Sequence, residues 1–394
     1  MNTKPRLALL AFLIALVILP QNQSQANEGE IEPIPAESDA GAVVCIPGNF
    51  PTAPDGCLPL GPSADLTFQA ALGVPYPIPS LPAYSPDPTL AEIPYQYLKL
   101  TVEEEAFYFF DSLTKAMENS TSSVSVGPGF VYLSYTERIE NEEGAFFHLR
   151  SGAWARGDFG SRAALHRPFQ GLLFSSTPTF SFGWVLGEVA SYTTPGFGAR
   201  ASGIAHHRYE VVQVFDIQDV DGGTWLMIGP DEWLDYRHVS RIDPRQSPPE
   251  GITTDRWIEV NLDEQTVAVY QDNHLAFATV ISSGTGNWAT RPGVFQIYEK
   301  LESTTMSGAT EADRSDYYYL QDVPWTMYYD EARALHGAYW RTRFGFPQSH
   351  GCVNLAPGDA HWLFDWTNEG DPVYVWDPSG RTPVDPKAYG PGGA

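Results

Sequence analysis

The chain has 394 residues, which is too long for one average domain and predicts two or three, each with its own core. Its 23 Lys and Arg against 48 Asp and Glu give a formal charge of −25. Because so acidic a chain repels phosphate backbones, the charge argues against nucleic acid as a partner and against non-specific adhesion to anionic lipid.

Residues 1–26 have the layout of a cleaved secretory signal. Lys4 and Arg6 precede an apolar run from Leu7 to Leu19, and a polar stretch then ends at Ala26. The apolar run is short for a bilayer span, which needs about 20 residues. We therefore expect cleavage after Ala26, export to the cell envelope and no stable membrane span in the mature protein; an uncleaved anchor is the alternative.

Residues 27–94 are crowded with proline and have no sustained apolar periodicity. They predict an extended spacer, or an unstructured leader, that contains one small loop between Cys45 and Cys57. In an exported chain such a close pair predicts a disulfide. Cys352 is then the odd thiol, which is either buried and inert or retained for its reactivity.

Short strand-like runs broken by Gly, Asn and Asp fill residues 95–249. A weak repeat at an offset of 79 residues predicts two copies of one β module, at 95–170 and 171–249. The matched positions are Phe130 with Tyr209, Gly144 with Gly223, Phe146 with Trp225, and Trp154 with Trp233. The pattern resembles bacterial SH3-type modules associated with the cell wall, which implies that these modules bind wall polymer.

Residues 252–377 predict a third, mostly β domain. Apolar residues alternate at Ile258, Val260 and Leu262, and further strand-like runs follow as an antiparallel meander. A single helix is expected near the end, with Asp359 as its N-cap and Gly370 as its stop. Residues 378–394 have no core-forming content and predict a flexible tail.

The chemistry is expected in the segment Ser349-His350-Gly351-Cys352-Val353-Asn354. On a strand, His350 and Cys352 point to the same side, and a neighbouring imidazole favours the nucleophilic thiolate. His336 can fold back to the same thiol as a proton acceptor. A buried core cysteine is the plain alternative, and zinc is disfavoured because no four ligands have the spacing of a structural site.

The region from Asp255 to Trp376 resembles the catalytic domain of L,D-transpeptidases, the YkuD-like family. The resemblance lies in His336-Gly337 and in the motif from Ser349 to Asn354, with twelve residues between His336 and Ser349. It implies a mostly β fold, a β-sandwich or mixed β domain with a short helix, after the two SH3-like modules.

The same resemblance implies roles for individual residues. Cys352 would be the nucleophile and His336 its base, with the Gly337 carbonyl holding the imidazole tautomer. His350 and Ser349 would support the thiolate, and the amides of Gly351 and Cys352 would receive the oxyanion. The implied substrate-binding residues are Asn354, which orients the loop or the substrate, and the pocket walls Tyr318, Trp325 and Tyr339.

The implied reaction is L,D-transpeptidation of peptidoglycan through a thioester on Cys352. The thiol displaces D-alanine from a donor stem tetrapeptide, and an amine of an acceptor stem then forms a 3→3 cross-link. Covalent catalysis of this kind needs no metal and no cofactor. Two alternatives stay open: an L,D-carboxypeptidase that uses water as the acceptor, and an inactive wall-binding protein.

Overall fold

The computed structural model describes residues 69, 73–75, 78–100, 107–120, 124–127, 129–157, 160–162, 170–309 and 316–389. The predicted signal, the Cys45–Cys57 loop and most of the predicted spacer lie outside these residues. No helix in the described ranges is long and apolar enough to cross a membrane.

A seven-stranded sheet forms the middle of the molecule. In spatial order its strands are β1 (Ala83–Tyr84), β9 (Leu172–Phe174), β20 (His274–Val280), β19 (Thr266–Gln271), β18 (Trp257–Asn261), β26 (Pro372–Trp376) and β21 (Gly293–Gln296). Both faces are covered. Ile258 and Val260 point into one core, while Trp257 and Tyr270 point into a second core on the other face.

An eleven-stranded sheet joins the predicted catalytic region to the first predicted module. Its main path is β25 (Val353–Leu355), β24 (Arg333–Gly337), β23 (Tyr318–Asp330), β5 (Phe130–Asn141), β6 (Gly144–Leu149), β7 (Trp154–Arg156), β3 (Phe107–Phe110) and β4 (Val124–Val126). β2 (Gln96–Leu100), β8 (Gly160–Arg162) and β22 (Glu299–Gly308) pair at its sides. The junction is the parallel pair β5·β23, in which Phe130 lies opposite Tyr318.

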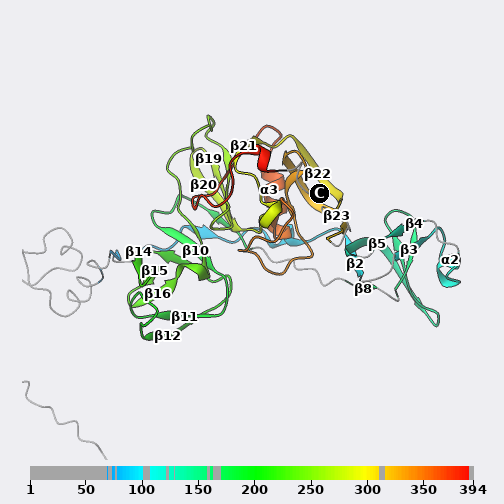
Figure 1. The fold of residues 1–394 in the computed structure, drawn as a ribbon, viewed down its shortest axis with the longest axis horizontal. Coiled ribbons are helices and arrows are strands. Elements are labelled where there is room, and N and C mark those ends of the chain that lie inside the picture. The colour runs from blue at the N-terminus through cyan, green and yellow to red at the C-terminus, as the bar shows by residue number, and fades with distance from the viewer. Residues whose placement is uncertain are drawn as a thin grey trace, which may run out of the picture.

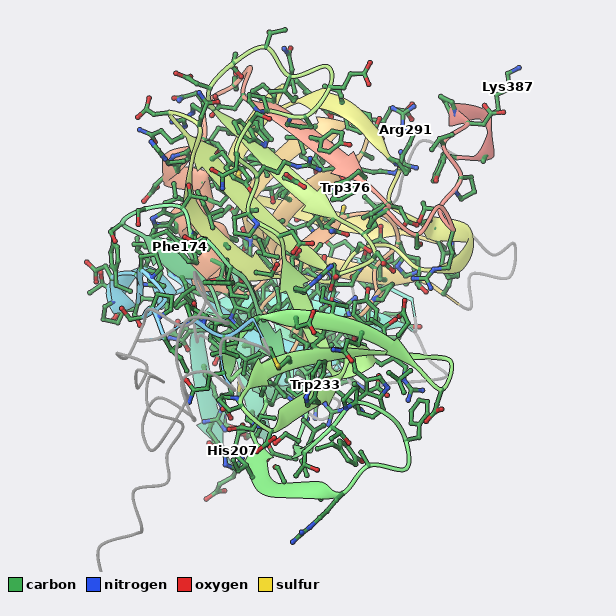
Figure 2. The ribbon with its side chains drawn as sticks, turned by 90° about the vertical axis from the view of Figure 1, so that its left-hand side faces the viewer. Phe174, His207, Trp233, Arg291, Trp376 and Lys387 are labelled. Carbon is green, nitrogen blue, oxygen red and sulfur yellow. The ribbon has the colours of Figure 1, made fainter. Side chains whose placement is uncertain are left out.

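The second predicted module contains two small sheets. One is β13 (Val211–Val214), β10 (Ser181–Val185) and β17 (Val239–Ile242); the other is β12 (Ala201–His206), β11 (Val189–Tyr192), β16 (Glu232–Asp235), β15 (Gly223–Gly229) and β14 (Asp216–Val220). Phe182 and Trp184 of β10 pack against Trp257 of the central sheet. In Figure 1 the two modules lie on opposite sides of the region that carries β19 to β23, and Figure 2 places Trp233 in the second module and Trp376 in the sheet beside it.

The offset of 79 residues recurs in the strand pairing of the two modules. Each contains a three-stranded meander, β5·β6·β7 and β14·β15·β16, with the same register. The equivalent pairs are Asn141 opposite Gly144 and Val220 opposite Gly223, Ile139 opposite Phe146 and Gln218 opposite Trp225, and His148 opposite Trp154 and Met227 opposite Trp233. Phe130 and Tyr209 are not equivalent, since Phe130 begins β5 whereas Tyr209 precedes β13. The SH3-like assignment stays a prediction.

The α-helices are α2 (Leu113–Met117) and α3 (Pro357–Trp366), and the 3-10 turns are η2 (Pro88–Ala91), η3 (Tyr236–His238), η4 (Gly286–Trp288) and η5 (Pro386–Ala388). The predicted ends of the last helix are wrong: Ala356 is the N-cap of α3 and Thr367 its C-cap. The Asp359 side chain instead points into the protein, where Thr279 Oγ1 at 2.5 Å and the Gly171 amide at 3.0 Å donate to it.

Both ends of the described chain are more ordered than predicted. Ile93, inside the predicted spacer, is buried in the main core, and Leu90 O accepts from His361 of α3 at 2.9 Å. In the predicted tail, Asp377 accepts from the Thr382 amide at 2.8 Å, and Arg381 pairs with Asp263. The folded region therefore begins before residue 94, and residues 378–389 are held against it.

Candidate active site

Two neighbouring strands bring the predicted catalytic residues together. β24 ends with His336 and Gly337, and β25 begins directly after Cys352. The strands are parallel, with His336 opposite Asn354. The twelve residues between His336 and Ser349 can therefore return the chain to the same edge of the sheet, beside the imidazole.

A cavity of about 450 Å³ lies over this edge. It is lined by side chains from β23, β24, the loop and the motif, and by Phe130 from the first module. The lining residues are Phe130, Met306, Asp316, Tyr318, Leu320, His336, Trp340, Arg341, Thr342, Arg343, Gln348, Ser349, His350, Cys352 and Asn354. A thiol, two imidazoles and an amide thus share one solvent-connected space.

The turn that carries the thiol is fixed by Ser349. Its Oγ donates to Cys352 O at 2.5 Å and accepts from the Gly351 amide at 3.1 Å. Gly351 has a φ of +121°, a conformation that other residues rarely adopt, and Thr290 Oγ1 donates to its carbonyl at 2.8 Å. In this structure the Gly351 amide thus donates to Ser349, and the oxyanion role of the Gly351 and Cys352 amides stays a prediction.

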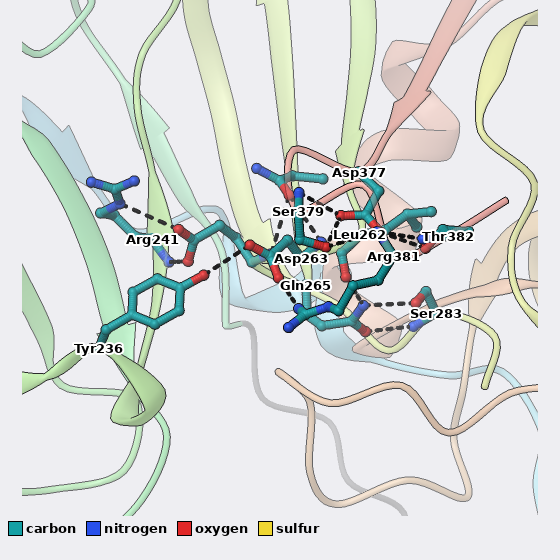
Figure 3. A network of polar contacts seen from close by, with 12 residues as sticks. Tyr236, Arg241, Leu262, Asp263, Gln265, Ser283, Asp377, Ser379, Arg381 and Thr382 are labelled. Atoms are coloured by element: carbon teal, nitrogen blue, oxygen red, sulfur yellow. Dashed lines mark hydrogen bonds and ion pairs between the residues drawn. The ribbon is translucent and has the colours of Figure 1, made fainter. Parts of the chain in front are cut away.

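A hydrogen-bonded network supports this turn from behind. The amides of Gln348 and Ser349 donate to Ser283 O at 2.8 and 2.9 Å, and the Ser283 amide donates to Gln265 Oε1 at 2.8 Å. Figure 3 shows Gln265 and Ser283 in the same network as Asp263, to which Tyr236 of the second module and Arg381 of the tail contribute. The motif is thus tied to both flanking segments.

Burial favours the neutral forms of the thiol and the imidazole. It raises the pKa of the Cys352 thiol to about 11, although the positive charge of Arg333 acts in the opposite direction. Burial also lowers the pKa of His336 to about 4, against the effect of the Gly337 carbonyl, which lies 3.4 Å from Nδ1. Both shifts favour a neutral thiol beside a neutral imidazole, so burial opposes the thiolate that the motif suggested. The thiol lies 3.7 Å from Ala332 O.

His350 stands between aromatic rings at the cavity wall. Its ring stacks on Tyr318 with centroids 5.1 Å apart and lies 4.7 Å from the Trp288 ring. Burial lowers the pKa of His350, and Asp316 opposes this change. Tyr318 is thus placed in the cavity, where the sequence predicted it.

The other two aromatic residues predicted as pocket walls lie elsewhere. Tyr339 is fully buried, stacks on Tyr97 with centroids 3.6 Å apart and donates to Gln321 O at 2.9 Å. Trp325 stacks on His361 of α3, 4.3 Å away, in a separate hollow. Both predictions are wrong because the chain turns these rings toward the core and α3.

The residues that line the cavity without having been predicted include Trp340 and Arg341. Trp340, the neighbour of Tyr339, lies 5.7 Å from the His336 ring between centroids. Arg341 is half-buried, and the loss of hydration lowers its pKa to about 10. Their proximity to the predicted base along the chain was the one signal that could have indicated them. Within the described ranges, no group of three or more His, Cys, Asp or Glu side chains could hold a metal ion.

Comparison with known proteins identifies the domain around this cavity. Residues 255–375 match the family model of the YkuD L,D-transpeptidase catalytic domain. Residues 255–375 are therefore a YkuD L,D-transpeptidase catalytic domain. The YkuD domain comprises β18 to β26 together with α3, and it carries Cys352, His336 and the cavity.

Individual relatives match the same part of the chain. L,D-transpeptidase 1 of Mycobacterium tuberculosis is 29% identical over 168 residues, which cover 36% of this chain and 65% of the relative. The solved catalytic domain of an Enterococcus faecium L,D-transpeptidase is 31% identical, and the match covers 32% of this chain and 100% of that domain, with a TM-score of 0.29. A longer E. faecium L,D-transpeptidase chain is 30% identical and is covered over 50% of its length, also with a TM-score of 0.29. The chain thus spans about two thirds or less of its longer relatives.

Proposed function

We propose that this protein is an L,D-transpeptidase that forms 3→3 peptidoglycan cross-links through a thioester on Cys352. The observation that carries the proposal is the placement of Cys352 and His336 on one cavity inside a YkuD domain. The substrates are stem peptides of peptidoglycan, one as donor and one as acceptor.

In the first step the Cys352 proton passes to His336 as the sulfur attacks the carbonyl carbon of the third stem residue. The C–S bond forms, the peptide bond to D-alanine breaks, and His336 returns the proton to the leaving amine. In the second step an acceptor amine attacks the thioester carbon. Its proton passes through His336 to the departing sulfur, so that the new amide bond forms and the thiol is restored.

A neutral Cys352 thiol beside a neutral His336 is the starting state that these two reaction steps require. A thiol with a pKa of about 11 is a poor nucleophile until a base takes its proton, and His336 with a pKa of about 4 is unprotonated at neutral pH. Acylation therefore depends on proton transfer in the donor complex. We assign to Ser349 the support of the turn, and to His350 and Tyr318 a wall of the substrate cavity.

Product analysis tests the proposal. A tetrapeptide stem should give D-alanine and a mass adduct on Cys352, and with an acceptor stem it should give a cross-linked dimer. Cys352→Ala should give neither adduct nor product. A tripeptide as the sole product in the presence of acceptor would favour the L,D-carboxypeptidase alternative. Absence of both adduct and product in the unaltered protein would favour an inactive wall-binding protein.

The segments outside the YkuD domain concern export and binding to the cell wall. We propose that residues 1–26 direct export, and that the modules at 95–170 and 171–249 bind wall polymer and raise the local concentration of stems. Sedimentation of the full chain with insoluble sacculi tests the second point. Recovery of the whole protein in the supernatant would contradict it.

A further inference from the structure

Arg341 is a half-buried cation at the cavity wall, and its hydrogen bonds are all with neutral groups. Its Nη1 donates to Gln348 Oε1 at 2.9 Å and its Nη2 to Gln348 O at 2.6 Å. Across the described part of the chain, no carboxylate forms an ion pair with it. A partly desolvated charge without a counter-ion adds little to stability, so its place beside the nucleophile suggests another role.

The remaining donors of Arg341 determine how the Asn354 amide is oriented. A guanidinium only donates, so the amide oxygen of Asn354 must face it, at 2.5 Å from Nε and 3.2 Å from Nη2. The amide nitrogen then faces the other way and lies 3.0 Å from His336 Nε2. Since an amide nitrogen only donates, Nε2 of His336 must be the acceptor.

We infer that Arg341 is a positioning residue that acts through Asn354 to hold His336 in the tautomer with its proton on Nδ1. In this tautomer Nδ1–H points to Gly337 O, 3.4 Å away, and Nε2 carries the lone pair. The other tautomer would place two N–H groups against each other at the Asn354 contact.

The contacts from Arg341 through Asn354 to His336 affect catalysis only if the protein carries out the proposed acyl transfer, so this part of the inference rests on the proposed function. In this tautomer Nε2 is the ring nitrogen with the lone pair, so it is the atom that would take the Cys352 proton, and the Asn354 amide keeps it unprotonated until the thiol replaces the amide as the donor. The charged and titratable groups around His336 are Arg341 and Cys352, with His350 and Asp316 further along the cavity wall.

Nitrogen NMR of the full-length protein, labelled at histidine, tests the inference directly. The His336 signals are assigned by their loss in His336→Gln. In the unaltered protein Nδ1 should be protonated and Nε2 should not. Arg341→Met should give a mixture of both tautomers, and single-turnover D-alanine release should fall roughly 10²-fold, the low end of what a general base contributes. Arg341→Lys, which retains a donor-only group, should restore the tautomer and part of the rate.

Two further variants separate positioning from loss of structure. Arg343→Met removes an equal charge two residues along the loop and should leave the His336 tautomer unchanged. Asn354→Asp keeps the size of the side chain but presents a carboxylate to Nε2, so His336 should become doubly protonated at neutral pH.

A single Nδ1–H tautomer in folded Arg341→Met would overturn the inference. If that variant does not fold, a neutral, Nδ1-protonated His336 in Asn354→Asp would overturn it instead. The proposed function can fail independently: the expected tautomer in a protein that releases no D-alanine would refute the activity and leave the positioning role standing.

Discussion

Replacing His336 by Gln should reveal the high pKa of the thiol as a steep pH dependence. Gln fills most of the space of the imidazole but cannot act as a base at neutral pH. The thiol must then react through its own thiolate fraction, which for a pKa of about 11 is about 10⁻⁴ at pH 7. Acylation should therefore fall by up to about 10⁴-fold, the upper end of what a general base contributes.

The acylation rate should depend on pH differently in the unaltered protein and in His336→Gln. In the unaltered protein the base has a pKa of about 4 and the thiol one of about 11, so acylation should be level between roughly pH 5 and 9. In His336→Gln the rate should rise about tenfold per pH unit over the same range, because thiolate rises tenfold per unit below its pKa. Single-turnover release of D-alanine from the tetrapeptide stem measures both profiles.

A matched variant tests whether burial causes the high pKa. His336→Ala opens the cavity to water, and a hydrated thiol returns toward a pKa of about 8.5, which leaves about 3% thiolate at pH 7. The Ala variant should therefore react faster than the Gln variant at pH 7, by as much as about 10²-fold. A level profile for His336→Gln, or equal rates for the two variants, would refute the reasoning.

Three further predictions concern stability and export. Tyr97→Ala should lower the free energy of unfolding by about 3–5 kcal/mol, because it removes a buried ring stacked on Tyr339. Replacing the exposed Tyr108 by Ala should change this free energy by less than about 0.5 kcal/mol. Urea unfolding measures both variants, and similar values would contradict the packing argument. Asp359→Asn should cost about 1–3 kcal/mol in the same assay, since an amide nitrogen would face the donors that now bind the carboxylate, and an unchanged midpoint would speak against those contacts. Cys45 and Cys57 should be found linked when the exported protein is mapped without reduction, and recovery of both as free thiols would exclude the pairing.

The sequence was most informative where the reactive residues are close to one another along the chain. The segment from Ser349 to Asn354 and the dipeptide at His336 indicated the site, and the parallel register of β24 and β25 places both at one edge. The alternation at Ile258 and Val260 predicted strand β18 because a buried sheet face repeats every second residue.

The rest depended on contacts between distant parts of the chain. The parallel pairing of β5 with β23 joins segments almost 190 residues apart, and no local pattern encodes such a register. The directions of the Tyr339 and Trp325 rings depend on partners that the sequence does not indicate, Tyr97 and His361. The raised pKa of Cys352 likewise follows from burial rather than from the neighbouring His350, so the motif alone suggested a thiolate that the fold does not provide.

The β5·β23 junction makes one wall of the cavity depend on a strand outside the YkuD domain. Phe130 lines the cavity from strand β5 of the first module, opposite Tyr318. The position of this ring is therefore set by the register of β5 on β23. A slip of β5 along β23 would move Phe130 relative to Cys352 while leaving the thiol and His336 in place.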